Sequence, residues 1–439
     1  MNLADLQTFR VVACDLNGQM RGKVVPGSYS DKLPTGSVRL PFSALDVDLW
    51  GTDIVGSPLV FESGDADGML FPTDRAPCPV PWLETPSAIV PVTLSNEDGT
   101  PFAGDPRHAL VRVLADYDTR GWQVIAATEM EFTLVDDKGD APTPPADPRN
   151  DVPLDGGEVL SVSQIDAFAA FFDDLYAGAA AMGIPAETAT SEAGIGQFEI
   201  TMRHGPALEA ADNAWLFKSL VRGLARKHGM AATFMAKPYL DDSGNGMHVH
   251  FSVLDSEGNN VFDNGGPEGT DTMRHAVAGC LAAMPASSLI FAPFANSYDR
   301  LVDGAHAPTA AAWGYDNRTV AIRIPGGPNG ARRIEHRTAG GDINPYLLLS
   351  AVLGAAMIGI KDEWEPSEPI VGNAYDVDDL PRLAADWTAA TDMFASDPLI
   401  SRIFDPMLIG NLVRCKRQEI EKFEQMPAST HWRALLERV

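Results

Sequence analysis

The sequence predicts an α+β protein in which a small, mostly β region precedes a larger region of alternating helices and strands. Residues 1–104 contain short β-branched runs separated by turn-forming residues, as is typical of short strands. From residue 106 onward, amphipathic helical patterns alternate with strands, which favours a mixed helix and sheet domain. With 439 residues, the chain is long enough to bury the cores of two domains. We therefore expect domains at 1–104 and 105–439.

Charge and cysteine content restrict the partners and the compartment. The formal net charge is −27, from 60 acidic and 33 basic residues, which argues against nucleic acid or an anionic membrane as a partner. The four cysteines are far apart, without metal-ligand spacing, and this favours a reducing compartment. Two prolines interrupt the apolar run at 276–295, so a core helix is favoured over a membrane span. Because the first residues show no secretory signal, we expect a cytoplasmic protein.

The N-terminal region is predicted to contain strands over 9–15, 23–26 and 88–94. Clusters such as Ser63-Gly64-Asp65 mark the turns between them. Several aspartates lie in these loops, among them Asp46 and Asp48. Because Asp caps turns locally, most of these aspartates are interpreted as turn residues.

Helices are predicted from caps and from apolar periodicity. Asp105-Pro106 predicts a helix over 106–119, because Asp is a good N-cap and Pro fits the first helical position. Apolar residues three and four apart predict helices over 165–182 and 212–228, each followed by a glycine. A further helix at 346–360 is apolar nearly all round and is expected to be buried. The Pro-, Asp- and Gly-rich stretch at 136–157 is expected to be a surface excursion.

A strand predicted over 124–135 carries two acidic residues on one face. Alternate side chains of a strand point to opposite faces, so Glu129 and Glu131 share a face. The opposite face is apolar and contains Ala126, Met130, Phe132 and Leu134. Two carboxylates this close repel each other unless a positive charge lies between them. Taken alone, the pattern favours a strand with a solvated polar side.

Four further segments repeat the polar face, at 196–200, 247–252, 321–325 and 333–337. Solvated faces should be rich in Lys, Thr and Ser, whereas these carry Glu, His and Arg. A cavity lined by strands accounts for this composition. The carboxylates and one imidazole of the set suit a hard divalent cation, Mg²⁺ or Mn²⁺, better than zinc. These candidate metal ligands are Glu129, Glu131, Glu192, Glu199, His248 and Glu335.

Arginines concentrate in the span 300–337, although the chain as a whole is acidic. A local basic cluster of this kind indicates an anionic ligand. Metal ligands, arginines and carboxylates together are the equipment of phosphoryl transfer. A metal-dependent hydrolase uses similar groups, so the composition of the site leaves both classes open. The candidate anion-binding arginines of this span are Arg300, Arg318, Arg323, Arg333 and Arg337.

Seven spaced motifs resemble those of the glutamine synthetases, over nearly the whole chain. They are TEMEF (128–132), EAGIGQFEI (192–200), GNGMHVHFS (244–252), NSYDRLV (296–302), NRTVAIRIP (317–325), ARRIEHR (331–337) and NPY (344–346). The resemblance implies an N-terminal β-grasp domain followed by a catalytic α/β domain, with a curved antiparallel sheet lining the active site. It also implies stacked hexameric rings, and hence a homo-oligomer of twelve subunits, with active sites between neighbouring subunits.

The resemblance assigns a role to each motif residue. It implies a first metal on Glu131, Glu192 and Glu199, and a second on Glu129, His248 and Glu335. It implies phosphate binding by Arg318, Arg323 and Arg333, of which Arg318 is the candidate catalytic residue. ATP contacts fall on His250 and Ser252, and glutamate contacts on Gly244, Arg300 and Arg337. In the implied reaction, ATP phosphorylates the γ-carboxylate of glutamate, and an amine attacks the acyl phosphate.

The chain departs from true glutamine synthetases around the amine. His306 stands where the family has a catalytic glutamate and is a candidate catalytic base, since the pKa of an imidazole is near neutral, and Ser243 replaces a family asparagine. The family's aspartate loop is matched only loosely, with Asp46 or Asp48 as its candidate catalytic residue. No aromatic residue follows Gly156-Gly157. These departures resemble the γ-glutamylamide branch, in which the acceptor is a primary amine such as a polyamine. A true glutamine synthetase using ammonia is the alternative reading, and an inactive structural or sensing homologue is the non-enzymatic one.

Overall fold

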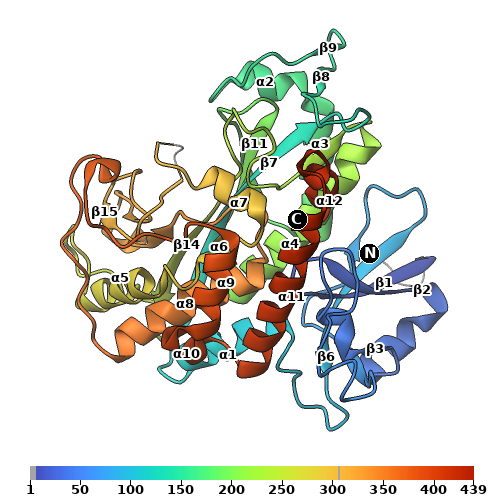
Figure 1. The fold of residues 1–439 in the computed structure, drawn as a ribbon, viewed down its shortest axis with the longest axis horizontal. Helices are drawn as coiled ribbons and strands as arrows, with labels where there is room; N and C mark the ends of the chain where they lie inside the picture. Colours follow the sequence, from blue (N-terminus) through green and yellow to red (C-terminus); the bar gives the residue numbers. More distant parts are fainter. Residues whose placement is uncertain (1–5, 305–306) are drawn as a thin grey trace.

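The computed structural model describes residues 6–304 and 307–439, and it folds as two main sheets with helices packed around them (Figure 1). Within these residues, a six-stranded sheet is built from the N-terminal part of the chain and a nine-stranded sheet from the part after it. The predicted α+β class is confirmed. The domain boundary at residue 104 stays a prediction, although the strands of the two sheets come from separate stretches of sequence.

The N-terminal sheet has the strand order β2-β1-β6-β4-β3, with β5 paired to β6. Three of its strands match the prediction, namely β1 (Thr8–Cys14), β2 (Met20–Pro26) and β6 (Ser87–Ser95). Three short ones were not predicted, namely β3 (Arg39–Pro41), β4 (Asp67–Pro72) and β5 (Cys78–Pro79). The 3-10 helices η2 (Gly27–Thr35) and η3 (Phe42–Leu45) lie in its connections.

The two faces of β1 belong to different hydrophobic cores. Phe9 and Val11 point into a core that is confined to the N-terminal region. Val12 and Cys14, on the other face, join the large core formed mainly by residues after 105. The alternation of the strand therefore attaches the small sheet to the larger unit. All four cysteines of the chain are free and buried, as the sequence indicated.

The large sheet is organised around β7 (Gln123–Val135), the strand that carries Glu129 and Glu131. Its strand order is β10-β11-β7-β14-β17-β16-β15, with β12 and β13 also paired to β7. The pairs are antiparallel except for β15 with β16, which is parallel. The partners are β10 (Ala186–Ser191), β11 (Gln197–Met202), β12 (Gly205–Pro206), β13 (Ala231–Thr233), β14 (Met247–Leu254), β15 (Trp313–Tyr315), β16 (Ile322–Ile324) and β17 (Ile334–His336).

Helices cover the apolar side of β7. The predicted helix after Asp105 is α1 (Pro106–Asp118), and the Asp105 side chain accepts a hydrogen bond from the backbone N–H of Arg107. The buried helix α8 (Pro345–Lys361) is capped by Asn344 and contacts α1. It also packs against α4 (Ala207–Lys227) and α5 (Asp271–Ala283). Every residue of α8 before Lys361 is buried, as its all-round apolar pattern predicted.

Several predicted helix boundaries were wrong. The helix expected over 165–182 is two helices, α2 (Val162–Ala167) and α3 (Ala169–Met182), separated at Phe168. The helix expected from 212 begins earlier, at Ala207, directly after Pro206. The apolar run at 276–295 covers the end of α5, then α6 (Ser288–Phe291) and the first residue of α7 (Ala295–Arg300), because its prolines end one helix before the next begins. None of the helices in the described residues has the length and apolarity needed to cross a membrane.

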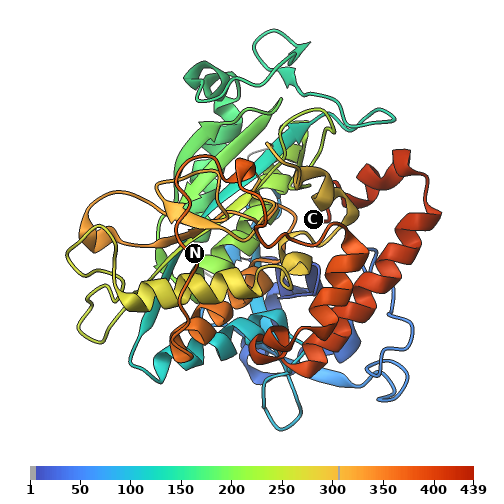
Figure 2. The same ribbon diagram turned by 60° about the vertical axis from the view of Figure 1, so that its left-hand side comes forward.

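The C-terminal part of the chain is helical, and the sequence analysis made no prediction for it. Asp386, Asp397 and Asp405 cap successive helices through their side chains. These helices lie side by side (Figure 2, orange-red to red). They are α9 (Trp387–Ser396), α10 (Pro398–Ile403) and α11 (Pro406–Gln425), followed by α12 (His431–Leu435). Three-residue 3-10 turns are η4 (Asn329–Ala331), η5 (Ala374–Asp376) and η6 (Ala428–Thr430).

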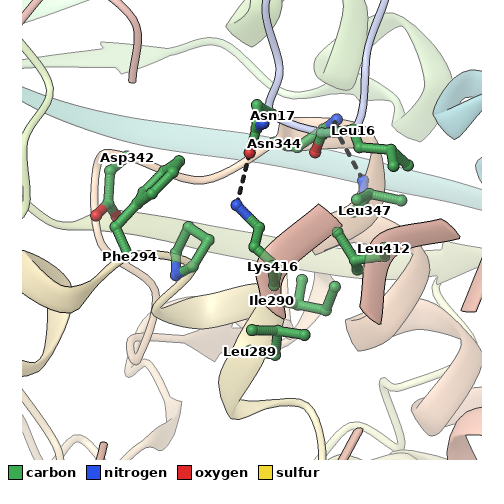
Figure 3. A pocket seen from close by; sticks show the side chains of 11 residues that line it. Leu16, Asn17, Leu289, Ile290, Phe294, Asp342, Asn344, Leu347, Leu412 and Lys416 are labelled. Carbon is green, nitrogen blue, oxygen red and sulfur yellow. Dashed lines mark hydrogen bonds between the residues drawn. The ribbon is translucent and has the colours of Figure 1, made fainter. Parts of the chain in front are cut away.

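A buried ion pair joins α11 to the N-terminal region. The side chains of Lys416 and Glu419 are 1% and 0% exposed, and their charged atoms lie 2.8 Å apart. Lys416 also donates to the Asn17 side chain at 2.6 Å, as Figure 3 shows, and stands 4.0 Å from the centre of the Phe294 ring. Glu419 accepts from the backbone N–H of Leu49 at 2.7 Å. The pair therefore fixes the position of two N-terminal loops against α11.

The stretch at 136–157 is a surface excursion, as predicted. It contains a two-stranded hairpin of β8 (Ala146–Asp147) and β9 (Val152–Pro153) that projects from the body of the molecule (Figure 1, top). Val152 is 57% exposed.

Candidate active site

The register of the large sheet brings the predicted polar faces together. On one side of β7, Glu131 lies opposite Glu199 of β11. On the other side of the same strand, Glu129 lies opposite His248 of β14. One strand further, His250 lies opposite Glu335 of β17. Directly opposed residues of an antiparallel pair have Cβ atoms about 4.5–5.5 Å apart, so four strands present one cluster of carboxylates and imidazoles.

Glu129 is the centre of this cluster. Its two carboxylate oxygens pair with His248 Nδ1 at 3.0 Å and with His250 Nε2 at 2.9 Å. Burial acts to raise the pKa of Glu129, but the hydrogen bonds and charges of the two histidines outweigh it and hold this pKa below its ordinary value. Arg333 Nε donates to His250 Nδ1 at 3.3 Å, so the proton of His250 is assigned to Nε2, facing Glu129.

The neighbouring carboxylates lack such partners. Burial, together with repulsion from Glu131 and Glu129, raises the pKa of Glu192 to about 7. Burial and the same neighbours raise the pKa of Glu199 to about 9. Crowded carboxylates of this kind are stabilised as anions by a cation between them. The donor set, carboxylate oxygens and imidazole nitrogens, fits a hard divalent metal ion.

Among residues 6–304 and 307–439, two groups of side chains could each hold a metal ion, with donor atoms within 4.8 Å of one another. The first is Glu129, Glu199 and His248, and the second is Glu129, His250 and Glu335. Four of the six candidate ligands fall in these groups. Neither group contains Glu131 or Glu192, and His250, which the resemblance placed at ATP, joins the second group. The assignment of individual ligands to two metals stays a prediction.

Arginines border the cluster on β16 and around β17. Glu335, buried at 1% exposure, pairs with Arg323 Nη1 at 2.9 Å and with Arg337. Arg323 also pairs with Asp316 at 2.6 Å. Among the described residues, the Nε atoms of Arg323 and Arg337 are buried and have no hydrogen-bond partner. These two guanidinium donors are therefore unsatisfied within the described part of the chain.

Arg300 lies across the glycine turn at 244–246. Its side chain is buried, and its Nη1 donates to the carbonyl oxygen of Thr338 at 2.9 Å. A Cβ at Gly246 would come within 2.6 Å of Arg300 Nη2, and a Cβ at Gly244 within 2.2 Å of the Ala236 carbonyl oxygen. The turn therefore requires glycine, and it brings Arg300 beside Glu131.

The remaining predicted residues are placed differently. Arg318 is close enough to Glu192 to act against the rise of its pKa. Ser252 lies on β14, the strand that carries His248 and His250. His306 lies outside the described residues.

The structure does not bring Asp46 and Asp48 to the cluster within one chain. Asp48 binds Gln418 at 2.9 Å and pairs with Lys422, both on α11. Asp46 accepts from the Ser57 hydroxyl at 2.5 Å and is buried. Their predicted catalytic role stays a prediction.

Gln197 lies in the polar segment at 196–200, and the sequence assigned it no role. In the structure, its side-chain NH₂ group donates to Glu131 at 3.1 Å and to the carbonyl oxygen of Gly244 at 2.9 Å. The motif EAGIGQFEI contains the residue, but no local pattern shows that its partners come from two other segments.

Comparison with known proteins identifies the class. The family model described as "Glutamine synthetase, catalytic domain" matches residues 103–435. The chain therefore belongs to the glutamine synthetase family and is a ligase of that family. It is similar to the γ-glutamylputrescine synthetase PuuA of Escherichia coli, with 36% identity over 96% of this chain and 89% of that protein. It is also similar to the γ-glutamylethanolamide synthetase GlnA4 of Streptomyces coelicolor, with 34% identity over 80% of this chain and 75% of that protein.

A solved structure confirms the predicted glutamine-synthetase-type fold. The structure titled "GmaS/ADP complex-Conformation 1" superposes with a TM-score of 0.85 and 25% identity, and covers 99% of each chain. The family assignment and this superposition together establish that the cluster on β7, β11, β14 and β17 lies in a glutamine-synthetase-type catalytic domain.

Proposed function

We propose that this protein joins L-glutamate, through its γ-carboxylate, to a primary amine at the expense of ATP. The products are a γ-glutamylamide, ADP and phosphate. The observation that carries the proposal is the arrangement of Glu129, His248 and Glu335 on three adjacent strands, bordered by arginines with unpaired donors. Two relatives that the chain matches over most of its length are named for the γ-glutamylation of amines.

The side chains suit a two-step reaction. In the first step, a γ-carboxylate oxygen of glutamate bonds to the γ-phosphorus of ATP, and the bond to ADP breaks. In the second, the amine nitrogen bonds to the carbonyl carbon of the γ-glutamyl phosphate, phosphate leaves, and the amine loses a proton. Arg323 and Arg333 would bind the transferring phosphoryl group, and Arg300 and Arg337 would bind glutamate. The carboxylate nucleophile needs no base, so positioning and charge stabilisation are the main requirements.

The carboxylates and histidines would hold two divalent cations, Mg²⁺ or Mn²⁺. By family resemblance, Glu131, Glu192 and Glu199 hold one, and Glu129, His248 and Glu335 hold the other. Such ions neutralise phosphate charge during transfer. The chain contributes crowded carboxylates, and a bound cation would lower the raised pKa values of Glu192 and Glu199.

We propose that the acceptor is an alkylamine or a polyamine, with ammonia, as in a true glutamine synthetase, as the alternative. The experiment measures phosphate release with glutamate, ATP and a panel of putrescine, ethanolamine, methylamine and ammonium chloride at equal concentrations. The proposal expects at least one organic amine to have a higher kcat/KM than ammonium. If ammonium exceeds every amine, the alternative holds. If no nucleophile releases phosphate above the glutamate-free background, the inactive homologue holds.

We further propose a cytoplasmic double hexameric ring, in which the loop containing Asp46 and Asp48 faces the active site of a neighbouring subunit. The support is the family resemblance and the fixed position of this loop against α11. Light scattering coupled to gel filtration should show twelve copies of the 47.0 kDa chain. A mass that corresponds to a monomer would contradict an active site completed by a neighbour.

A further inference from the structure

The carboxamide of Gln197 joins three segments that belong to different parts of the sequence. Its NH₂ group donates to Glu131 Oε2 on β7 and to the carbonyl oxygen of Gly244. Its Oε1 accepts from the backbone N–H of Gly194 at 2.9 Å. Both N–H donors and the acceptor are therefore engaged, and this fixes the orientation of the amide.

The third segment is the turn that carries Glu192. The backbone N–H of Glu192 donates to the Gln197 carbonyl oxygen at 3.0 Å, and the Gln197 N–H donates to the Gly194 carbonyl oxygen at 3.1 Å. A Cβ at Gly194 would lie 2.7 Å from Gln197 Oε1, so the turn closes tightly on the side chain. Gln197 is 3% exposed, and water therefore cannot replace these bonds.

The bonds leave one oxygen of Glu131 free. Gln197 and the backbone N–H of Gly246 both donate to Oε2, the latter at 2.6 Å. Within the described residues, Oε1 receives no hydrogen bond and lies on the side of Arg300. A carboxylate held through one oxygen presents the other in a fixed direction, which is how an indirect partner orients a metal ligand.

We propose that Gln197 is a positioning residue that couples cation binding to glutamate binding. Through Glu131 and the turn that carries Glu192, it orients the ligands of the cation. Through the turn at Gly244, it orients the glutamate subsite. The proposal rests on the function proposed above. It adds a residue that contacts neither substrate nor metal but whose single amide group sets the geometry of both subsites.

The test compares Gln197→Met and Gln197→Asn with Gln164→Met. Gln164 is the matched control, because it is also buried and accepts a backbone N–H, that of Glu158 at 3.0 Å, but lies on α2. Free Mn²⁺ is measured by electron paramagnetic resonance during titration of each full-length variant, without and with glutamate. The KM for glutamate and kcat are measured separately, with the best amine of the panel.

The expected result is a loss of Mn²⁺ affinity of about ten-fold or more in Gln197→Met, the effect typical of such indirect partners. Gln197→Asn, whose amide is too short to span the three segments, should lie between it and the wild type. In the wild type, glutamate should increase the affinity for Mn²⁺, because coupling between two sites is reciprocal. In Gln197→Met, which lacks the coupling amide, this increase should vanish. The KM for glutamate should rise more than kcat falls, while Gln164→Met should match the wild type.

Wild-type Mn²⁺ affinity and glutamate enhancement in a folded Gln197→Met would overturn the proposal. Misfolding of both Gln197 variants, with Gln164→Met folded, would also overturn it, since Gln197 would then be a general folding residue. The titration of Mn²⁺ alone does not depend on the reaction. If the wild type ligates no amine, the proposed function fails, but the Mn²⁺ titration still tests the role of Gln197.

Discussion

Glu131 and Glu199 stand directly opposite each other on neighbouring strands, β7 and β11. Opposed like charges destabilise an antiparallel pair. Burial, followed by the charges of Glu129 and Glu131, raises the pKa of Glu199 to about 9. Without a bound cation, Glu199 is therefore costly to keep charged at this contact, and this has consequences that can be measured.

Substitution of Glu199 by Gln should have opposite effects with and without metal. Without metal near neutral pH, Glu199 must take up a proton on folding because its pKa is raised, whereas Gln is already neutral, so that the melting temperature of Glu199→Gln should rise by a few degrees, corresponding to about 1 kcal/mol. With saturating Mn²⁺, the wild type should gain stability by mass action, whereas the variant should gain less because it has lost an anionic ligand. Differential scanning fluorimetry with EDTA or with Mn²⁺ measures the melting temperature of each protein in the two conditions. An equal Mn²⁺ shift in the two proteins would contradict a cation at this contact.

Arg323→Met should impair ATP use selectively. Arg323 pairs with Glu335 at 2.9 Å and retains an unpaired buried Nε, so its removal takes away both a phosphate donor and a partner of a buried carboxylate. We expect the KM for ATP to rise about ten-fold or more, because this is the cost of losing one hydrogen bond to a charged group. Arg417→Met is the control, because Arg417 pairs with Asp392 where both side chains are more than half exposed. Steady-state kinetics with varied ATP concentration measure the KM of each variant for ATP. Equal KM values for the two variants would contradict the prediction.

The ion pair between Lys416 and Glu419 should respond to single and double substitutions differently. Glu419→Ala leaves Lys416 charged and buried, which costs about 3–5 kcal/mol. The double variant Lys416→Met with Glu419→Gln removes both charges and keeps an acceptor for the Leu49 N–H, so it should cost less than Glu419→Ala. Urea denaturation followed by circular dichroism compares the variants. A double variant less stable than Glu419→Ala would show that the charges themselves stabilise the fold.

Lys218 should make stability depend on pH. Burial, followed by the charge of Arg222, lowers the pKa of Lys218 to about 7. In the unfolded chain this pKa is about 10.4, so between these values the unfolded state binds more protons than the folded one. Stability should therefore rise with pH from about 7 to about 10, by at most about 1.4 kcal/mol per unit. Lys218→Met should remove this contribution, and melting temperatures measured from pH 6.5 to 9.5 test it. Parallel curves for the two proteins would contradict it.

The sequence predicted most of the elements that bury a regular apolar face. β7 and α8 have the lengths and faces expected from their patterns, since period two and all-round apolarity are strong local signals. Strand β4 was missed because it contains Gly and Pro and depends on pairing with β3 and β6, and the two-residue β5 was missed because it contains Pro and pairs with β6. The split at Phe168 was missed because apolar periodicity continues through it.

The sequence predicted which residue types form the site more completely than it predicted which of these residues contact each other. The polar faces of five strand segments indicated that carboxylates, imidazoles and arginines would meet, and the register brings Glu129, His248 and Glu335 together. The pairing of His250 with Glu129, by contrast, depends on side-chain direction across two strands. The bonds of Gln197 depend on a turn closing over it from another segment, and no local pattern contains that information.

β7 carries core residues and reactive residues on alternate positions of one thirteen-residue strand. A single inserted or deleted residue within it would exchange the two faces and turn Glu129 and Glu131 into the apolar interior. Diversification toward new amines must therefore proceed by substitution and by changes in connecting loops, never by a change in the length of this strand. A deletion scan should accordingly tolerate losses in the projecting hairpin around 146–153 and reject every one between 124 and 134.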